Sequence, residues 1–161
     1  MSNNPKIITV NDRSGKDLSI AGNAYQIIIS GAETDGKFAI IDMLVPPGGG
    51  PVPHAHPDFQ ESFYVLEGEV QFKTETEKYT ATKGAFISIP QNGPIHCFKN
   101  TSNAPARLLC TVAPSGLEEF FTEVAAVTAD LSGPPDENTK QKLSALSEKY
   151  GQRIYPPDYL D

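Results

Sequence analysis

The sequence has few cysteines and no long hydrophobic run, and these absences exclude several classes of protein. Its two cysteines, Cys97 and Cys110, have neither the C-x-x-C nor the zinc-ribbon spacing. We therefore expect two buried thiols rather than a disulfide framework. No apolar stretch reaches the length of a signal peptide or of a membrane span, so the sequence predicts a cytoplasmic protein.

Positive charge is also scarce in this chain. The 161 residues include 13 lysines and arginines against 20 acidic residues, for a formal net charge of −7. Such a charge repels both the phosphates of nucleic acids and the anionic surface of membranes. We therefore expect neither nucleic acid nor a membrane as a partner.

Short β-rich runs fill the chain up to about Ala113. They are rich in β-branched and aromatic residues and are separated by Gly, Pro, Asn and Asp. Glu67-Gly68-Glu69 is interpreted as a tight hairpin. Many short strands of this kind predict a sandwich or barrel in a single domain over 1–161, with its core at about 24–113. The predicted strands are 25–29, 38–45, 62–66, 70–74, 85–89 and 107–112.

The composition changes after Pro114, and two helices are predicted in an extension over about 115–151. Ser115 and Glu118 resemble a capping box that opens a helix through about Val127. A second helix is expected to start after Asp136 and to end at Gly151, the usual position of a left-handed cap. The first helix should dock on the barrel through the apolar stripe Leu117, Phe120, Phe121 and Val124.

All three histidines fall in two short segments that also contain Glu61. His54 and His56 are two residues apart, so on a strand both imidazoles point to the same face. Glu61 follows a turn, and His96 arrives from a different hairpin, as ligands around an ion inside a barrel must do. Three histidines and a carboxylate suit one divalent transition metal: iron, manganese, nickel, cobalt, copper or zinc.

Each of these residues also has a simpler interpretation. A His-x-His pair facing a barrel interior can be two hydrogen-bonded core histidines, and Glu61 can be a base that does not ligate. Gathering three histidines and one acid inside a barrel without an ion would leave buried polar groups poorly satisfied. The sequence therefore favours a metal site formed by His54, His56, Glu61 and His96.

The same residues resemble the two motifs of the cupin superfamily. One departure is visible, because two residues rather than one separate Pro90 from Gly93, and we expect the turn to absorb the extra residue as a bulge. The resemblance implies an all-β fold, the cupin-type double-stranded β-helix or jelly-roll barrel, here with two C-terminal helices. The first motif is met by Gly48, His54, His56, Glu61 and Gly68, and the second by Gly84, Pro90, Gly93, His96 and Asn100.

Within that superfamily the chain looks most like the small single-domain, quercetin-dioxygenase-like proteins of the cupin 2 conserved-barrel group. The similarity lies in the Phe-Tyr-Val-Leu-x-Gly stretch at 63–68, in the passage 114–120 and in the Lys-Tyr-Gly-x-x-x-x-Pro-Pro tail at 149–157. The resemblance implies that a flavonol hydroxyl binds the metal, that Glu61 is catalytic and accepts its proton, and that dioxygen attacks the ring. It also implies a homodimer, in which a strand such as 6–10 is exchanged or paired at an edge.

Three functions remain open at this point. The leading hypothesis is a metal-dependent dioxygenase acting on a flavonol or related small enolisable aromatic compound, with a small-molecule substrate and dioxygen as its partners. The second is a metal-dependent isomerase or epimerase for a sugar or keto acid, against which the apolar inward strands argue. The third is a non-enzymatic cupin that binds a small molecule. A barrel of this kind serves all three, so the fold does not choose among them.

Overall fold

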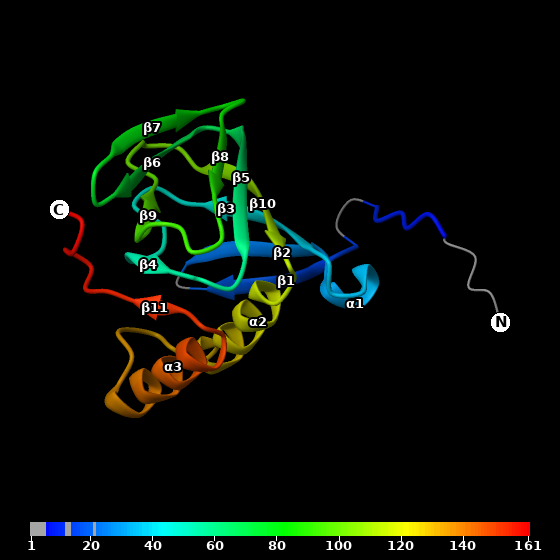
Figure 1. Ribbon diagram of the computed structural model, residues 1–161. Helices are drawn as coiled ribbons and strands as arrows, with labels where there is room; N and C mark the ends of the chain where they lie inside the picture. The colour runs from blue at the N-terminus through cyan, green and yellow to red at the C-terminus, as the bar shows by residue number, and fades with distance from the viewer. Residues whose placement is uncertain (1–5, 12–13, 21) are drawn as a thin grey trace.

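The computed structural model describes residues 6–11, 14–20 and 22–161, and its strands form two antiparallel sheets that face each other (Figure 1). The first sheet has six strands in the order β1 (Lys16–Ile20), β2 (Asn23–Ile29), β3 (Ala39–Val45), β10 (Ala106–Ala113), β5 (Gln60–Glu67) and β8 (Phe86–Ile89). The second has five, in the order β11 (Arg153–Ile154), β4 (His54–Ala55), β9 (His96–Lys99), β6 (Glu69–Thr74) and β7 (Lys78–Thr82). This arrangement confirms the expected all-β jelly-roll barrel.

The core lies between the two sheets and is built from alternating side chains. In β3 and β10 every second residue is buried, as the two-residue period of a strand requires. Phe63 comes from the first sheet, and Phe72 and Phe98 come from the second. Their ring centroids lie 5.3 to 5.6 Å apart, the spacing of favourable aromatic pairs. This cluster joins the two sheets through the barrel interior.

Three helices accompany the sheets in the described part of the chain: α1 (Gly31–Thr34), α2 (Leu117–Thr128) and α3 (Glu137–Lys149). The longer two, α2 and α3, lie together on one side of the barrel (Figure 1), which confirms the expected C-terminal helices. Asp136 caps α3 by accepting a hydrogen bond from the Thr139 N–H, and Gly151 follows the helix at φ 66°. No helix among these described residues is long and apolar enough to cross a membrane.

The start of α2 differs from the expected capping box at Ser115. The N-cap residue is Gly116, and no side chain of an N-cap residue hydrogen-bonds to the first turn of the helix. The Glu118 carboxylate instead accepts hydrogen bonds from the backbone N–H groups of Gly31 and Gly116, at 2.9 and 2.7 Å. A buried acid therefore ties the first turn of α2 to α1, while a true capping box forms at Ser30.

Two further sequence predictions differ from the structure. The strands β5 and β6 belong to opposite sheets, so Glu67-Gly68-Glu69 is a corner between sheets and not a hairpin. Gly68 has φ 71°, and a Cβ there would lie 2.9 Å from the Pro105 carbonyl oxygen, which explains the glycine. Residues 6–10 form no strand in this chain, and the edge strands of the first sheet are β1 and β8.

Asn100, from the second sequence motif, holds the loop after β9 in place. It is fully buried, and its amide nitrogen donates to the carbonyl oxygens of Val45 and Ala104 at 3.0 and 2.8 Å. Its amide oxygen accepts from the backbone and the hydroxyl of Ser102. All hydrogen-bonding groups of a buried amide are thereby satisfied, so Asn100 serves the fold rather than the chemistry.

Candidate metal centre

The four candidate ligands come from both sheets and meet inside the barrel. His54 on β4 and His96 on β9 are opposite each other in antiparallel register, and His56 follows β4 directly. Glu61 projects from β5 in the facing sheet, where its neighbours are Val112 and Ile89. One ligand atom from each of the four residues lies within 4.8 Å of the other three. The structure therefore brings together every residue that the sequence predicted for the site.

Backbone carbonyls orient two of the imidazoles. The Nδ1 atom of His54 lies 2.9 Å from the carbonyl oxygen of Val52, and Nδ1 of His96 lies 2.9 Å from that of Pro94. A carbonyl can only accept, so each Nδ1 carries the proton and donates it. The lone pair is then on Nε2, on the other side of the ring, as in histidines that bind metals.

Glu61 is the charged group of the cluster. It is buried, its Oε2 lies 2.9 Å from His56 Nε2 and 3.6 Å from His96 Nε2, and its Oε1 accepts from the Cys110 thiol at 3.4 Å. Burial alone would raise the pKa of Glu61, but interactions with His56 and His96 outweigh it and hold this pKa well below its usual range. A buried anion therefore faces the histidines.

His54 is in the neutral state that a ligand needs. Loss of hydration, and next the proximity of His96, lower the pKa of His54 to about 4. At neutral pH the cluster thus presents an uncharged His54 beside the Glu61 carboxylate. A divalent cation is favoured by this combination, since neutral imidazole and ionised carboxylate are the ligating forms.

The cluster also contains buried polar atoms that lack a partner. His96 Nε2 and His56 Nδ1 have no hydrogen bond to any described residue. Leaving a buried polar atom unpaired costs about 1–3 kcal/mol, and coordination would give His96 Nε2 a partner. The donor set of three imidazoles and one carboxylate, without thiolate, is typical of first-row transition metals. The residues present therefore fit a metal site.

Two neighbours support the cluster. Phe59 is buried and stacks on the His56 ring, with centroids 4.3 Å apart and planes 14° apart. Burial, and next the charge of Glu61, raise the pKa of the Cys110 thiol, so Cys110 donates to Glu61 and is no nucleophile. Both cysteines are free, as expected, although Cys97 is only partly buried.

The turn before His96 absorbs its extra residue. The Gly93 N–H donates to the Pro90 carbonyl oxygen at 2.9 Å, which closes the turn. The positive φ of 57° falls on Asn92, a residue type that tolerates this conformation. His96 consequently still reaches its position opposite His54.

A cavity of about 100 Å³ opens from the cluster, and it is lined mostly by apolar side chains. Part of its wall comes from α2. The sequence predicts that the apolar face of this helix docks on the barrel, but not that it covers the candidate site. Another part comes from the segment after α3, whose place in this wall is not predicted from the sequence. The lining residues beyond the cluster are Tyr25, Met43, Pro51, Val52, Phe63, Phe98, Leu117, Phe120, Phe121, Gln152 and Ile154.

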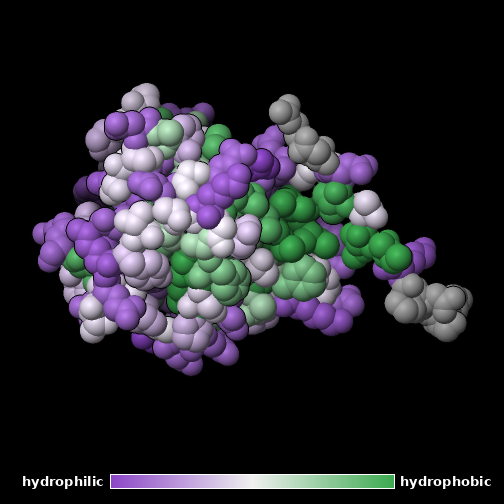
Figure 2. All heavy atoms as spheres, turned by 90° about the horizontal axis from the view of Figure 1, so that it is seen from above, coloured by the Kyte–Doolittle hydropathy of each residue, from purple (hydrophilic) through white to green (hydrophobic). Residues whose placement is uncertain are grey.

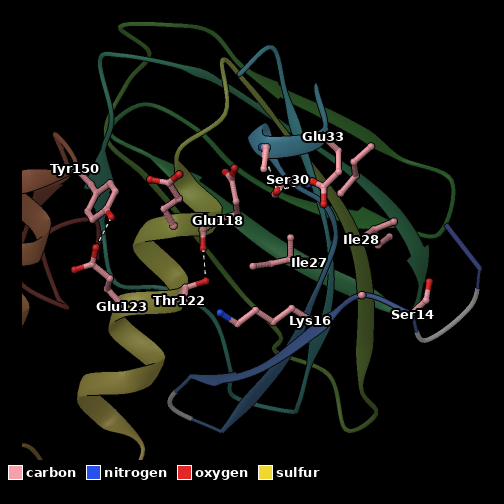
Figure 3. Close-up of a pocket in the computed structure, with 14 residues that line it drawn as sticks. Ser14, Lys16, Ile27, Ile28, Ser30, Glu33, Glu118, Thr122, Glu123 and Tyr150 are labelled. Carbon is pink, nitrogen blue, oxygen red and sulfur yellow. Dashed lines mark hydrogen bonds between the residues drawn. The ribbon is translucent and has the colours of Figure 1, made fainter. Parts of the chain in front are cut away.

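A larger hollow of about 600 Å³ lies outside the barrel, between α2 and the first two strands (Figure 3). Its lining contains four glutamates, yet the buried one, Glu118, is fully engaged with backbone N–H groups. Glu123 accepts from Lys149 at 2.6 Å and from the Tyr150 hydroxyl at 2.5 Å. These acids are occupied with the fold, so the hollow is a weaker candidate for chemistry than the smaller cavity.

The two facing sheets form a β-barrel, and three histidines and one carboxylate inside it form a candidate metal site. Residues 41–112 match the family described as the Cupin domain, and this match contains all four residues of the cluster. This match over the barrel region confirms the resemblance to cupins seen in the sequence.

Relatives and solved structures agree with this assignment. Quercetin 2,3-dioxygenase of Bacillus subtilis is 27% identical over 107 residues, which cover 66% of this chain and 31% of that protein. An uncharacterized protein of Methanocaldococcus jannaschii is 33% identical over 78 residues, which cover 48% of this chain and 62% of that protein. The chain thus spans less than two thirds of the length of either relative. A cupin-superfamily sugar phosphate isomerase from Silicibacter pomeroyi matches with TM-score 0.59 and 18% identity, over 66% of this chain and 75% of that one.

Proposed function

We propose that this protein is a metal-dependent dioxygenase acting on a small, largely apolar, enolisable compound. The observation that carries the proposal is one buried carboxylate, Glu61, at the inner end of a pocket whose remaining walls are mostly apolar. An apolar wall suits a planar carbon skeleton, and an ionised acid suits the removal of a proton from its hydroxyl. The relative named quercetin 2,3-dioxygenase supports the same direction.

In this proposal each residue of the site has a separate role. When bound, a divalent transition metal supplies Lewis acidity and, if redox-active, electron transfer. His54, His56 and His96 would hold it, and Nδ1 of His54 and of His96 is oriented by backbone carbonyl oxygens. Glu61 accepts the enol proton, and the Cys110 thiol keeps its other oxygen in place. The apolar walls exclude water from the reacting group.

The size of the cavity limits the substrate. Pockets for drug-sized ligands have volumes of roughly 300–1,000 Å³. The cavity here measures about 100 Å³, which favours a compound of a few carbon atoms. A flavonol would fit only if side chains of α2 or of the segment after α3 moved outward. We therefore favour a small enol over a flavonol.

Dioxygen uptake tests the proposed function. Protein reconstituted separately with iron, manganese, nickel, cobalt, copper or zinc is given acetylacetone, other simple enols, or quercetin, and metal content is measured beside oxygen consumption. We expect uptake with small enols, in proportion to bound metal, and none in metal-free protein. Turnover without metal would contradict the proposal, and isomerisation without uptake would favour an isomerase. Saturable binding with no reaction for any pairing would instead identify a binding protein.

We also propose that the working unit is a homodimer. Ile7, Ile8 and Val10 are exposed, Ile7 by 95%, and Figure 2 shows apolar atoms gathered on the N-terminal segment where it extends from the body. A second copy would cover such side chains. We expect sedimentation equilibrium to give twice the chain mass and the variant Ile7→Ser/Ile8→Ser to give a monomer. A monomeric parent protein would overturn this proposal, and Leu131→Ser serves as a matched exposed control.

A further inference from the structure

The segment after α3 contributes one polar side chain, that of Gln152, to the wall of the cavity that opens from the candidate metal ligands. In β11, Arg153 is opposite Ala55 and Ile154 is opposite His54, so this short strand lies beside β4, which carries His54 and directly precedes His56 (Figure 1). Gln152 immediately precedes it. Gln152 and Ile154 line the same cavity as His54, Glu61 and His96. The cavity wall thus includes a residue from outside the matched region 41–112.

The position of Gln152 is fixed by its neighbours. Gly151 ends α3 at φ 66°, and a Cβ there would lie 2.5 Å from Asp58 Oδ2, so this turn packs closely on the loop between β4 and β5. The Gln152 N–H donates to the Ser147 carbonyl oxygen at 2.7 Å. On the other side, the Tyr155 N–H donates to the Pro53 carbonyl oxygen at 2.9 Å. The backbone is therefore anchored both before and after Gln152.

The Gln152 amide nitrogen is buried without a hydrogen bond to the described residues. The residue is 6% exposed, and its Nε2 has no hydrogen bond to any part of the chain that the structure describes. A buried amide nitrogen has two protons to donate. Leaving them without acceptors costs free energy, so most buried amides in folded proteins have hydrogen-bond partners. The other cavity walls beyond the cluster are apolar except for Tyr25. An oxygen atom of a bound molecule would satisfy this amide.

We propose that Gln152 is a substrate-binding residue. Its amide donates a hydrogen bond to one oxygen of the bound molecule, while another oxygen of that molecule lies at the metal site formed by the histidines. The site then selects compounds with two oxygens a few atoms apart, such as enolisable dicarbonyls, over compounds with one. This inference rests on the proposed function, because it names the substrate class of that site. It assigns selectivity to the C-terminal segment rather than to the matched barrel.

Binding without turnover tests the inference. Nickel-loaded protein is titrated with acetylacetone under nitrogen in a calorimeter, and Gln152→Leu is compared with the parent protein. Removing one hydrogen bond should weaken acetylacetone binding about tenfold. Binding of imidazole, which offers a ligand nitrogen but no oxygen, should be unchanged, and so should nickel affinity. Gln141→Leu, on the exposed face of α3, is the matched control and should behave as the parent.

Three outcomes would overturn the inference. Equal acetylacetone affinity in Gln152→Leu and the parent would show that the amide does not contact the ligand, and so would no binding to the parent. A loss of nickel affinity with unchanged acetylacetone affinity would make Gln152 a positioning residue for the ligands. Weakened acetylacetone binding in a protein that consumes no dioxygen would support this inference while the dioxygenase proposal failed. The two proposals therefore fail separately.

Discussion

Replacing His96 by alanine is expected to lower the affinity for a divalent transition metal by at least about a hundredfold, since even residues behind the ligands contribute about 10–100-fold. His96 is buried, and its Nε2 faces the cluster 3.6 Å from Glu61 Oε2, without a hydrogen bond to the described residues. The variant removes one of four donors and leaves a gap where the ring stood. Metal retained per chain, measured by mass spectrometry after dialysis against a graded chelator series, gives the result.

The neighbouring residue on the same strand provides the control. Cys97→Ala changes a partly exposed side chain next to His96 and should retain metal as the parent protein does. Circular dichroism establishes that both variants are folded. If His96→Ala held as much metal as the parent at every chelator concentration, the metal would lie elsewhere and the assignment of this cluster would be wrong.

Replacing Glu61 by glutamine is expected to lower turnover by about a hundred- to ten-thousandfold, the usual contribution of a general base. Glutamine keeps the shape of the side chain but carries no negative charge and cannot take the enol proton. Initial rates of dioxygen uptake with acetylacetone are measured together with metal content in each sample. Glu67→Gln, at the exposed end of the same strand, should react at the parent rate.

The metal content separates two roles of Glu61. If Glu61→Gln keeps its metal and loses turnover, the acid acts as a base; if both fall together, it also ligates. Parent-like turnover in Glu61→Gln would contradict a catalytic role of either kind.

The strands that the sequence predicted are those with an alternating buried face. Residues 39–45 and 106–113 bury every second side chain, and their pattern was visible in the sequence. The segment 78–82 was missed because four of its five residues are exposed and its β conformation depends on pairing with β6. The sequence predicts a hairpin at Gly68, where the structure has a corner, because a glycine turn has the same sequence pattern whether the next strand pairs with the first or crosses to the other sheet.

Spacing along the sequence predicts the candidate ligands, but it does not predict which residues form the walls of the cavity. His54 and His56 are two residues apart, and Glu61 and His96 stand at motif distances, so spacing alone placed them together. Gln152 reaches the cavity only because α3 docks beside α2 and β11 pairs with β4. A single glutamine after a helix has no periodicity that would mark it. Its role follows from tertiary structure.

The small size of β11 has a consequence for molecules that enter and leave. This strand contributes only two paired positions, while β3, β10 and β5 form the long ladders of the first sheet. Local opening of so short a strand should cost far less free energy than global unfolding. We expect amide hydrogen exchange to be fast at Ile154 and slow at Cys110. Breathing of this one edge would then set how quickly ligands exchange with bulk water, while the barrel around the histidines stays intact.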